Sequence, residues 1–123
     1  MVDWSAHELD AIGAADEIQI TTARPDGSLR SYIPIWVVRV GDALYVRSYR
    51  GEAGGWYRHA RRHPVGHIRT SGIEPDIEFT DPGGIAAEAV DQAYRRKYGG
   101  TGGYVNTMLR DDVAATTLRL TPR

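Results

Sequence analysis

The 123-residue chain contains no cysteine, and all of its apolar stretches are short. Without cysteine, the chain can form no disulfide and carries no thiolate nucleophile or thiolate metal ligand. A helix that crosses a membrane needs about 20 consecutive apolar residues, and no stretch approaches that length. The acidic beginning of the chain also lacks the basic start and apolar centre of a signal peptide. These absences predict a cytoplasmic protein with no membrane partner.

Net charge is also low, with a formal value of −1 at pH 7. Domains that bind nucleic acid are usually basic, so we expect no nucleic-acid partner. The arginines are nevertheless clustered, because six of them fall between Arg47 and Arg69 against a single acid, Glu52. Such a cluster in a near-neutral chain indicates a bound anion. The length and the apolar content of 41% fit one globular domain, residues 1–123.

Three segments have helical patterns: residues 5–15, 56–63 and 85–98. Ser5 and Glu8 have the spacing of a capping box, which marks the start of the first helix. Pro64 is expected to end the second helix. In the third helix, Asp91 and Arg95 are spaced i,i+4, so their side chains can pair.

Six segments have the composition and alternation of strands: residues 17–24, 30–40, 43–48, 65–71, 74–79 and 115–121. Pro34 cannot donate a ladder hydrogen bond, so the second segment is expected to lie at an edge or to contain a bulge. Residues 101–110 fit either a short helix or a loop. Strands joined by short hairpins favour a mainly β fold, either an antiparallel barrel or a strongly curled sheet.

Four short sequences carry a family resemblance: Ile33–Trp36, Leu44–Ser48, Gly54–Arg58 and His63-Pro64. Together they resemble the flavin-binding split-barrel superfamily, which includes pyridoxamine phosphate oxidases and deazaflavin-dependent nitroreductases. Nearly the whole chain is similar to the small bacterial family called domain of unknown function 2255. The succession of a glycine pair, Trp-Tyr, a basic residue and His-Pro is similar to a pattern of the deazaflavin enzymes. His59-Ala60 stand where that pattern has asparagine-leucine.

This resemblance implies a six-stranded antiparallel split β-barrel with a short N-terminal helix, a short mid-chain helix and a longer late helix. It also implies a homodimer, with the cofactor bound between the barrel and the partner subunit. The implied function is an oxidoreductase that uses deazaflavin (coenzyme F-420 type) or FMN to transfer hydride to a small conjugated or electron-poor substrate. Because a fold does not determine a function, the alternative is a non-catalytic split-barrel module that binds or stores a cofactor or other small ligand.

A flavin-type cofactor needs cationic and N–H donors for its phosphorylated tail and an apolar slot for its flat ring. The residues expected to bind the tail are Arg47, Ser48, Gly54, Gly55, Arg58, Arg61 and Arg62. Trp36 and Trp56 are expected to flank the ring, although Trp36 also fits core packing. Tyr98 and Tyr104 border glycine-rich loops, which makes them candidates for a lid or a substrate contact.

His59, His63 and His67 are spaced by four residues, which on one continuous helix would place them on one face. Pro64 is expected to interrupt that helix, and no carboxylate lies nearby in the sequence to complete a metal site. We therefore expect no metal centre.

Overall fold

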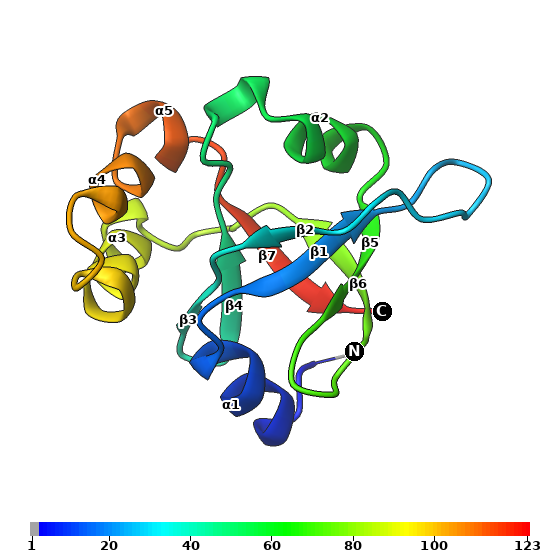
Figure 1. Ribbon diagram of the computed structural model, residues 1–123, viewed down its shortest axis with the longest axis horizontal. Coiled ribbons are helices and arrows are strands. Elements are labelled where there is room, and N and C mark those ends of the chain that lie inside the picture. Colours follow the sequence, from blue (N-terminus) through cyan, green and yellow to red (C-terminus); the bar gives the residue numbers. More distant parts are fainter. Residues whose placement is uncertain (1–2) are drawn as a thin grey trace.

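The chain folds into a strongly curled antiparallel sheet with helices at its ends and along one outer face (Figure 1). The computed structural model describes residues 3–123. Within that range, seven strands occur: β1 (Ile18–Thr22), β2 (Ile33–Ile35), β3 (Val38–Val40), β4 (Ala43–Val46), β5 (Val65–Arg69), β6 (Asp76–Thr80) and β7 (Leu118–Pro122). The helices are α1 (Ala6–Ala14), α2 (Gly55–Arg62), α3 (Ala87–Tyr98), α4 (Tyr104–Met108) and α5 (Asp111–Ala114), with a 3₁₀ turn, η1 (Gly51–Ala53).

The strand order is β2-β1-β5-β6-β7-β4-β3, and neighbouring strands are antiparallel throughout. β2 and β3 are consecutive in the chain but lie at opposite ends of this order. The sheet therefore curls until the short connection at Trp36-Val37 joins its two edges. The predicted antiparallel split barrel is confirmed, with one difference: the single strand expected over residues 30–40 is divided into β2 and β3.

The strand is divided at Val37, where side chains of α3 form hydrogen bonds with the backbone. The Val37 N–H donates to the Tyr98 hydroxyl at 3.3 Å, and the Val37 carbonyl accepts a hydrogen bond from Lys97 Nζ at 2.7 Å. A buried backbone needs partners, and here helix side chains supply them in place of a neighbouring strand. The chain can therefore leave β1 and turn toward β4. Pro34 lies in β2, which is an edge strand, as its sequence predicted.

Two apolar clusters hold these elements together. The larger one fills the barrel interior and is closed by α1 and α2, which lie at opposite ends in Figure 1. Its strand residues include Ile18, Ile20, Leu44, Val46, Ile68, Ile77 and Leu120. The smaller cluster joins β3 and β4 to α3, α4 and α5 through Val38, Tyr45, Val90, Tyr94, Met108 and Val113. This second cluster places α4 beside the end of β4.

The three predicted helices are confirmed, with ends that agree to within two residues. The capping box is present, because Ser5 Oγ accepts from the Glu8 N–H at 3.1 Å and a Glu8 carboxylate oxygen accepts from the Ser5 N–H at 2.9 Å. The ambiguous segment 101–110 contains α4. None of the helices within residues 3–123 combines the length and the apolar content that crossing a membrane requires.

Candidate functional site

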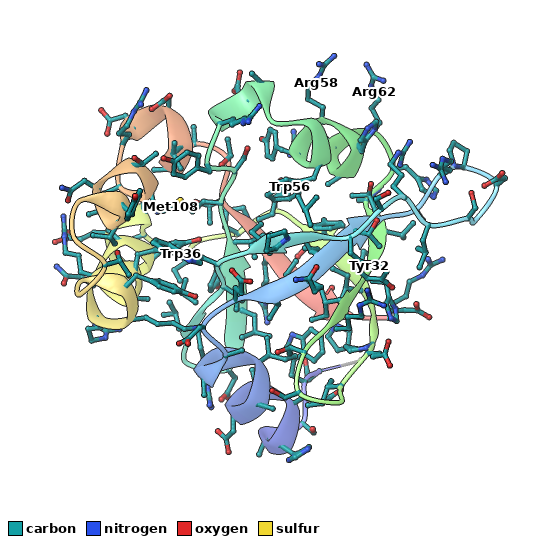
Figure 2. All side chains as sticks on the ribbon, in the orientation of Figure 1. Tyr32, Trp36, Trp56, Arg58, Arg62 and Met108 are labelled. Carbon is teal, nitrogen blue, oxygen red and sulfur yellow. The ribbon has the colours of Figure 1, made fainter. Side chains whose placement is uncertain are left out.

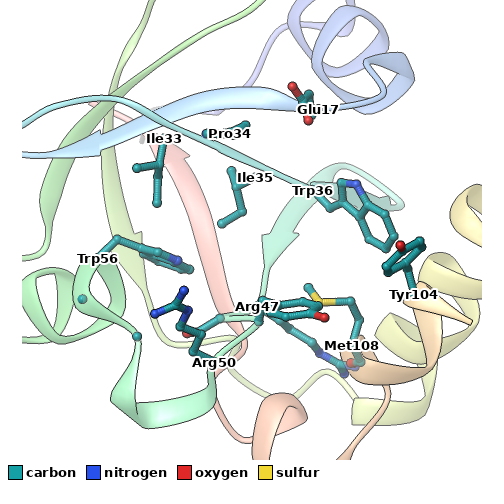
Figure 3. Close-up of a pocket in the computed structure, with 14 residues that line it drawn as sticks. Glu17, Ile33, Pro34, Ile35, Trp36, Arg47, Arg50, Trp56, Tyr104 and Met108 are labelled. Atoms are coloured by element: carbon teal, nitrogen blue, oxygen red, sulfur yellow. The ribbon is translucent and has the colours of Figure 1, made fainter. Parts of the chain in front are cut away.

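A cleft of about 690 Å³ opens where β2, the end of β4, the start of α2 and α4 meet (Figure 3). Its lining residues are Glu17, Ile33, Pro34, Ile35, Trp36, Arg47, Ser48, Tyr49, Arg50, Gly54, Gly55, Trp56, Tyr104 and Met108. Binding pockets for small molecules typically measure about 300–1,000 Å³ and combine apolar walls with a few polar groups. The size and the lining of this cleft therefore suit a small-molecule ligand.

Two tryptophans form aromatic walls of the cleft (Figure 3). Trp36, directly after β2, stacks on Tyr98 with the ring centroids 4.0 Å apart and the ring planes 4° apart. Tyr98 is buried, and its hydroxyl donates to the Asp16 carbonyl at 2.7 Å. Trp56, in the first turn of α2, packs against Phe79 of the barrel interior. Both indoles are supported from behind, so the walls exist before any ligand binds.

Arg47 lies at the floor of the cleft and has an exposed fraction of 0%. Its Nη1 donates to an Asp91 carboxylate oxygen at 2.5 Å and to the Met108 carbonyl at 2.8 Å. Nη2 donates to the Ala87 carbonyl at 3.2 Å, and Nε donates to Thr117 Oγ1 at 2.9 Å. One guanidinium thus ties the end of β4 to α3, to α4 and to the segment before β7.

The i,i+4 spacing allows Asp91 to pair with Arg95, but in the structure the Asp91 carboxylate pairs with Arg47. A buried guanidinium is costly without a counter-ion, whereas Arg95 is exposed and well solvated. The Arg47 guanidinium is hydrogen-bonded to protein groups, so Arg47 holds the floor of the cleft in place.

The chain turns sharply between β4 and α2. Ser48 Oγ donates to the Gly51 carbonyl at 2.7 Å, and the Gly51 N–H donates to the Ser48 carbonyl at 2.9 Å. Gly51 has a φ of +66°, in the left-handed region that favours glycine. A Cβ at Gly54 would lie only 2.3 Å from Ser48 Oγ. Ser48 and Gly54 therefore shape the turn that brings the start of α2 to the cleft.

The start of α2 and Arg50 bring anion-binding groups to the cleft. The N-cap, Gly54, offers no side-chain hydrogen bond, and the first N–H groups of any helix lack partners within that helix. The Arg50 guanidinium extends into the cleft beside Trp56 (Figure 3). Within residues 3–123, no carboxylate lies close enough to Arg50 to form a salt bridge. A cation beside a helix N-terminus favours a bound anion.

Seven of the residues proposed from the sequence line the cleft: Trp36, Arg47, Ser48, Gly54, Gly55, Trp56 and Tyr104. Four others lie outside it. Arg58 and Arg62 point away from the barrel on the outer side of α2 (Figure 2), and Arg61 pairs with Asp81 at 3.1 Å. Tyr98 lies behind Trp36 and supports its indole.

Sequence reasoning missed seven lining residues: Glu17, Ile33, Pro34, Ile35, Tyr49, Arg50 and Met108. Arg50 belongs to the arginine cluster and lies just past a strand end, so its position was a usable signal. Glu17 and Met108 carry no such signal, because they come from segments far away in the sequence.

Burial perturbs two ionisable groups behind the Trp36 wall. It raises the pKa of Tyr98 to about 12 and lowers the pKa of Lys97 to about 8. Lys97 Nζ lies 5.1 Å from the centre of the Tyr98 ring. At neutral pH the Tyr98 hydroxyl therefore stays protonated and keeps its hydrogen bond to the Asp16 carbonyl.

The sequence profile of a family described as "Uncharacterized protein conserved in bacteria (DUF2255)" matches residues 8–120. The chain belongs to the DUF2255 family. The matched range includes every residue that lines the cleft of this DUF2255 protein. No curated protein matches it in sequence.

Solved structures share the fold of the DUF2255 protein at low sequence identity. An F420-H2 dependent reductase matches with a TM-score of 0.60 and 16% identity, over 86% of this chain and 93% of that chain. A NimC/NimA family protein from Clostridium acetobutylicum matches with a TM-score of 0.59 and 13% identity, over 94% and 79%. An FAD-binding protein from Mesorhizobium loti matches with a TM-score of 0.52 and 14% identity, over 98% and 91%. These likenesses show that the DUF2255 protein shares the fold of these three proteins.

Proposed function

We propose that this DUF2255 protein is an oxidoreductase that binds a flavin-type cofactor in the cleft, a deazaflavin of the coenzyme F-420 type in preference to FMN. Its substrate is a small conjugated or electron-poor molecule. One observation carries the proposal: the cleft combines the aromatic walls Trp36 and Trp56 with a cation, Arg50, at a helix start. Structures with the same fold include proteins named as F420-H2 dependent and FAD-binding.

The residues of the cleft fit a flat ring with a phosphorylated tail. Trp36 and Trp56 would flank the ring, and Arg50 with the first N–H groups of α2 would hold the phosphate. A Cβ placed on Gly55 would meet nothing within 4 Å, so there is open space beside the Gly55 Cα at the start of α2. Arg58 and Arg62 point away from this space, and we therefore assign the binding of the tail phosphate to Arg50.

A bound flavin-type cofactor supplies the hydride-transfer chemistry, and the protein supplies binding, orientation and exclusion of water. The apolar residues of β2 and the two indoles limit the access of water to the ring site. Arg47 holds α4 against the barrel through the Met108 carbonyl. This places Tyr104, which is 68% exposed, at the cleft, where its hydroxyl can donate a hydrogen bond to a substrate.

Separate fluorescence titrations with the deazaflavin and with FMN test the proposal. We expect saturable binding, weakened about tenfold or more in Arg50→Ala, because a hydrogen bond to a charged group contributes about 1.5–3 kcal/mol. Arg61→Ala is the control: it removes one charge from α2 at a residue outside the cleft, where Arg61 pairs with Asp81, and it should leave the Kd nearly unchanged. If neither cofactor binds well above micromolar concentration, the proposal is wrong.

A non-catalytic module is the second candidate. It is favoured by the polar groups at the cleft floor, because the Arg47 guanidinium and Ser48 Oγ are bound to protein groups and form no acid–base pair for catalysis. Assays of nitroaromatic or quinone reduction with the reduced cofactor separate the two candidates. Binding without turnover would identify the module.

We also propose that the protein is a homodimer in which the partner subunit covers the mouth of the cleft. Ile33, Tyr49 and Tyr104 are large, exposed and all line the cleft, and a partner subunit would bury them. Light scattering after size-exclusion chromatography should give twice the mass of the chain, and a monomer at micromolar concentration would contradict this part of the proposal.

A further inference from the structure

A second, smaller recess, here called the side pocket, adjoins the cleft. Its volume is about 250 Å³, and its lining residues are Ile20, Thr21, Thr22, Arg30, Ser31, Ile33, Gly55, Trp56 and His59. Three of these residues, Ile33, Gly55 and Trp56, also line the cleft. The two recesses therefore share a wall formed by these three residues.

Arg30 is held in a fixed orientation in the side pocket. Its Nη1 donates to Thr22 Oγ1 at 3.2 Å and to the Ala23 carbonyl at 3.1 Å. Its backbone is fixed as well, because its N–H donates to the Thr22 carbonyl at 3.0 Å and its carbonyl accepts from Thr21 Oγ1 at 2.7 Å. Within residues 3–123, Nε and Nη2 form no protein hydrogen bond that meets standard geometry. A guanidinium held through one nitrogen keeps its other donors for a ligand.

Arginine side chains surround His59, and one of them, Arg30, lines the side pocket. Burial lowers the pKa of His59, and the charges of Arg30, Arg62, Arg58 and Arg24 lower it further. No carboxylate within residues 3–123 forms a salt bridge with any of these four arginines. By contrast, the neighbouring Arg61 is paired with an acid. Uncompensated positive charge in a recess attracts an anion.

We infer that the side pocket is an anion-binding subsite, which takes a phosphate or carboxylate group of the ligand that occupies the cleft. Arg30 and the His59 ring N–H are its donors, and Trp56 is the wall around which the ligand bends. The inference rests on the proposed ligand-binding role of the cleft, but it does not depend on which flavin-type cofactor binds there. The anionic group belongs either to the distal part of the cofactor or to the substrate.

Inorganic phosphate and pyrophosphate are the probes for the first test. The reporter is the His59 ring in proton NMR, assigned by the signal that disappears in His59→Gln. We expect saturable shifts of this signal and a higher His59 pKa when the anion is bound, because the anion offsets the surrounding positive charge. Arg30→Gln, which keeps a neutral donor toward Thr22 Oγ1, should weaken binding about tenfold or more.

Arg61→Ala is the control, since it removes one charge from the same helix at a residue that lies outside the side pocket. If phosphate leaves the His59 signal unchanged, or if Arg61→Ala weakens binding as much as Arg30→Gln does, the subsite is disproved. Circular dichroism of each variant shows whether the fold is retained. If phosphate does not shift the His59 signal while cofactor binding still depends on Arg50, this inference is wrong but the proposed function stands.

A second test identifies the source of the anion. If the group belongs to the cofactor, Arg30→Gln should weaken the binding of FAD or of the deazaflavin more than that of FMN. FAD has a second phosphate and the deazaflavin tail has carboxylates beyond its phosphate, whereas FMN ends at one phosphate. If it belongs to the substrate, the Kd of the cofactor should stay constant. In that case Arg30→Gln should raise the KM for 4-nitrobenzoate but not the KM for nitrobenzene. If Arg30→Gln changes neither the cofactor Kd nor the KM for 4-nitrobenzoate relative to that for nitrobenzene, the inference is contradicted.

Discussion

Removal of the Asp91 carboxylate is expected to destabilise the protein strongly, because it leaves the buried charge of Arg47 unpaired. Arg47 is 0% exposed, and Asp91 is its acidic partner. In Asp91→Ala the guanidinium keeps three neutral acceptors, which are the Met108 and Ala87 carbonyls and Thr117 Oγ1. These acceptors satisfy its hydrogen bonds but not its charge. The substitution therefore isolates the contribution of the counter-ion.

The expected loss in the free energy of unfolding is about 3 kcal/mol. Breaking a buried pair by removing one partner costs about 3–5 kcal/mol, and the Asp91 side chain is 21% exposed, which places it at the lower end. At roughly 4 °C per kcal/mol for a domain of this size, the Tm should fall by about 12 °C. The Arg61–Asp81 pair supplies the comparison, because its side chains are 55% and 82% exposed. Asp81→Ala should cost about 1 kcal/mol or less.

Urea unfolding followed by tryptophan fluorescence and by circular dichroism measures these differences. The m-value should stay the same in both variants, so that a change in midpoint reports stability alone. The double variant Arg47→Met/Asp91→Leu should recover most of the loss, since apolar residues often replace a buried ion pair at little cost. An Asp91→Ala protein as stable as Asp81→Ala would refute the assignment of Arg47 as a buried charge that needs a counter-ion.

Two further predictions concern the turn before α2 and the support of Trp36. Gly54→Ala should lower the free energy of unfolding by about 1–3 kcal/mol, because the new Cβ would lie 2.3 Å from Ser48 Oγ. In Gly55→Ala the new Cβ meets nothing within 4 Å, so this variant should lose far less stability. Thermal unfolding of both variants measures the difference, and equal losses would contradict the prediction. Burial lowers the pKa of Lys97 from 10.5 to about 8 in the folded state, so the unfolded chain binds the Lys97 proton more tightly. Protonated Lys97 should therefore destabilise the fold below pH 8, and this destabilisation should fade as the pH rises toward 10. Urea midpoints from pH 7 to 10 should rise less in Lys97→Met than in the parent protein, and identical slopes would exclude Lys97 as the cause.

The strands and helices followed from local patterns in the sequence. The Ser5–Glu8 capping box and the break at Pro64 depend on residues within one turn of each other, so the sequence alone was enough to place them. The division of the strand over residues 30–40 was not predictable in this way. It depends on Tyr98 and Lys97, which reach Val37 from a helix about 60 residues later.

In the candidate site, too, some features follow from neighbouring residues and others depend on distant segments. The chain itself concentrates arginines and glycines between Arg47 and Arg62, and this local composition predicts a segment that binds an anion. Which arginine faces a ligand depends on what packs against each one. Arg47 is buried because Asp91 approaches from α3, while Arg50 extends into the cleft and Arg58 points away from it. Charge and turn chemistry are properties of neighbouring residues, whereas burial and pairing are decided only when distant segments meet in the folded barrel.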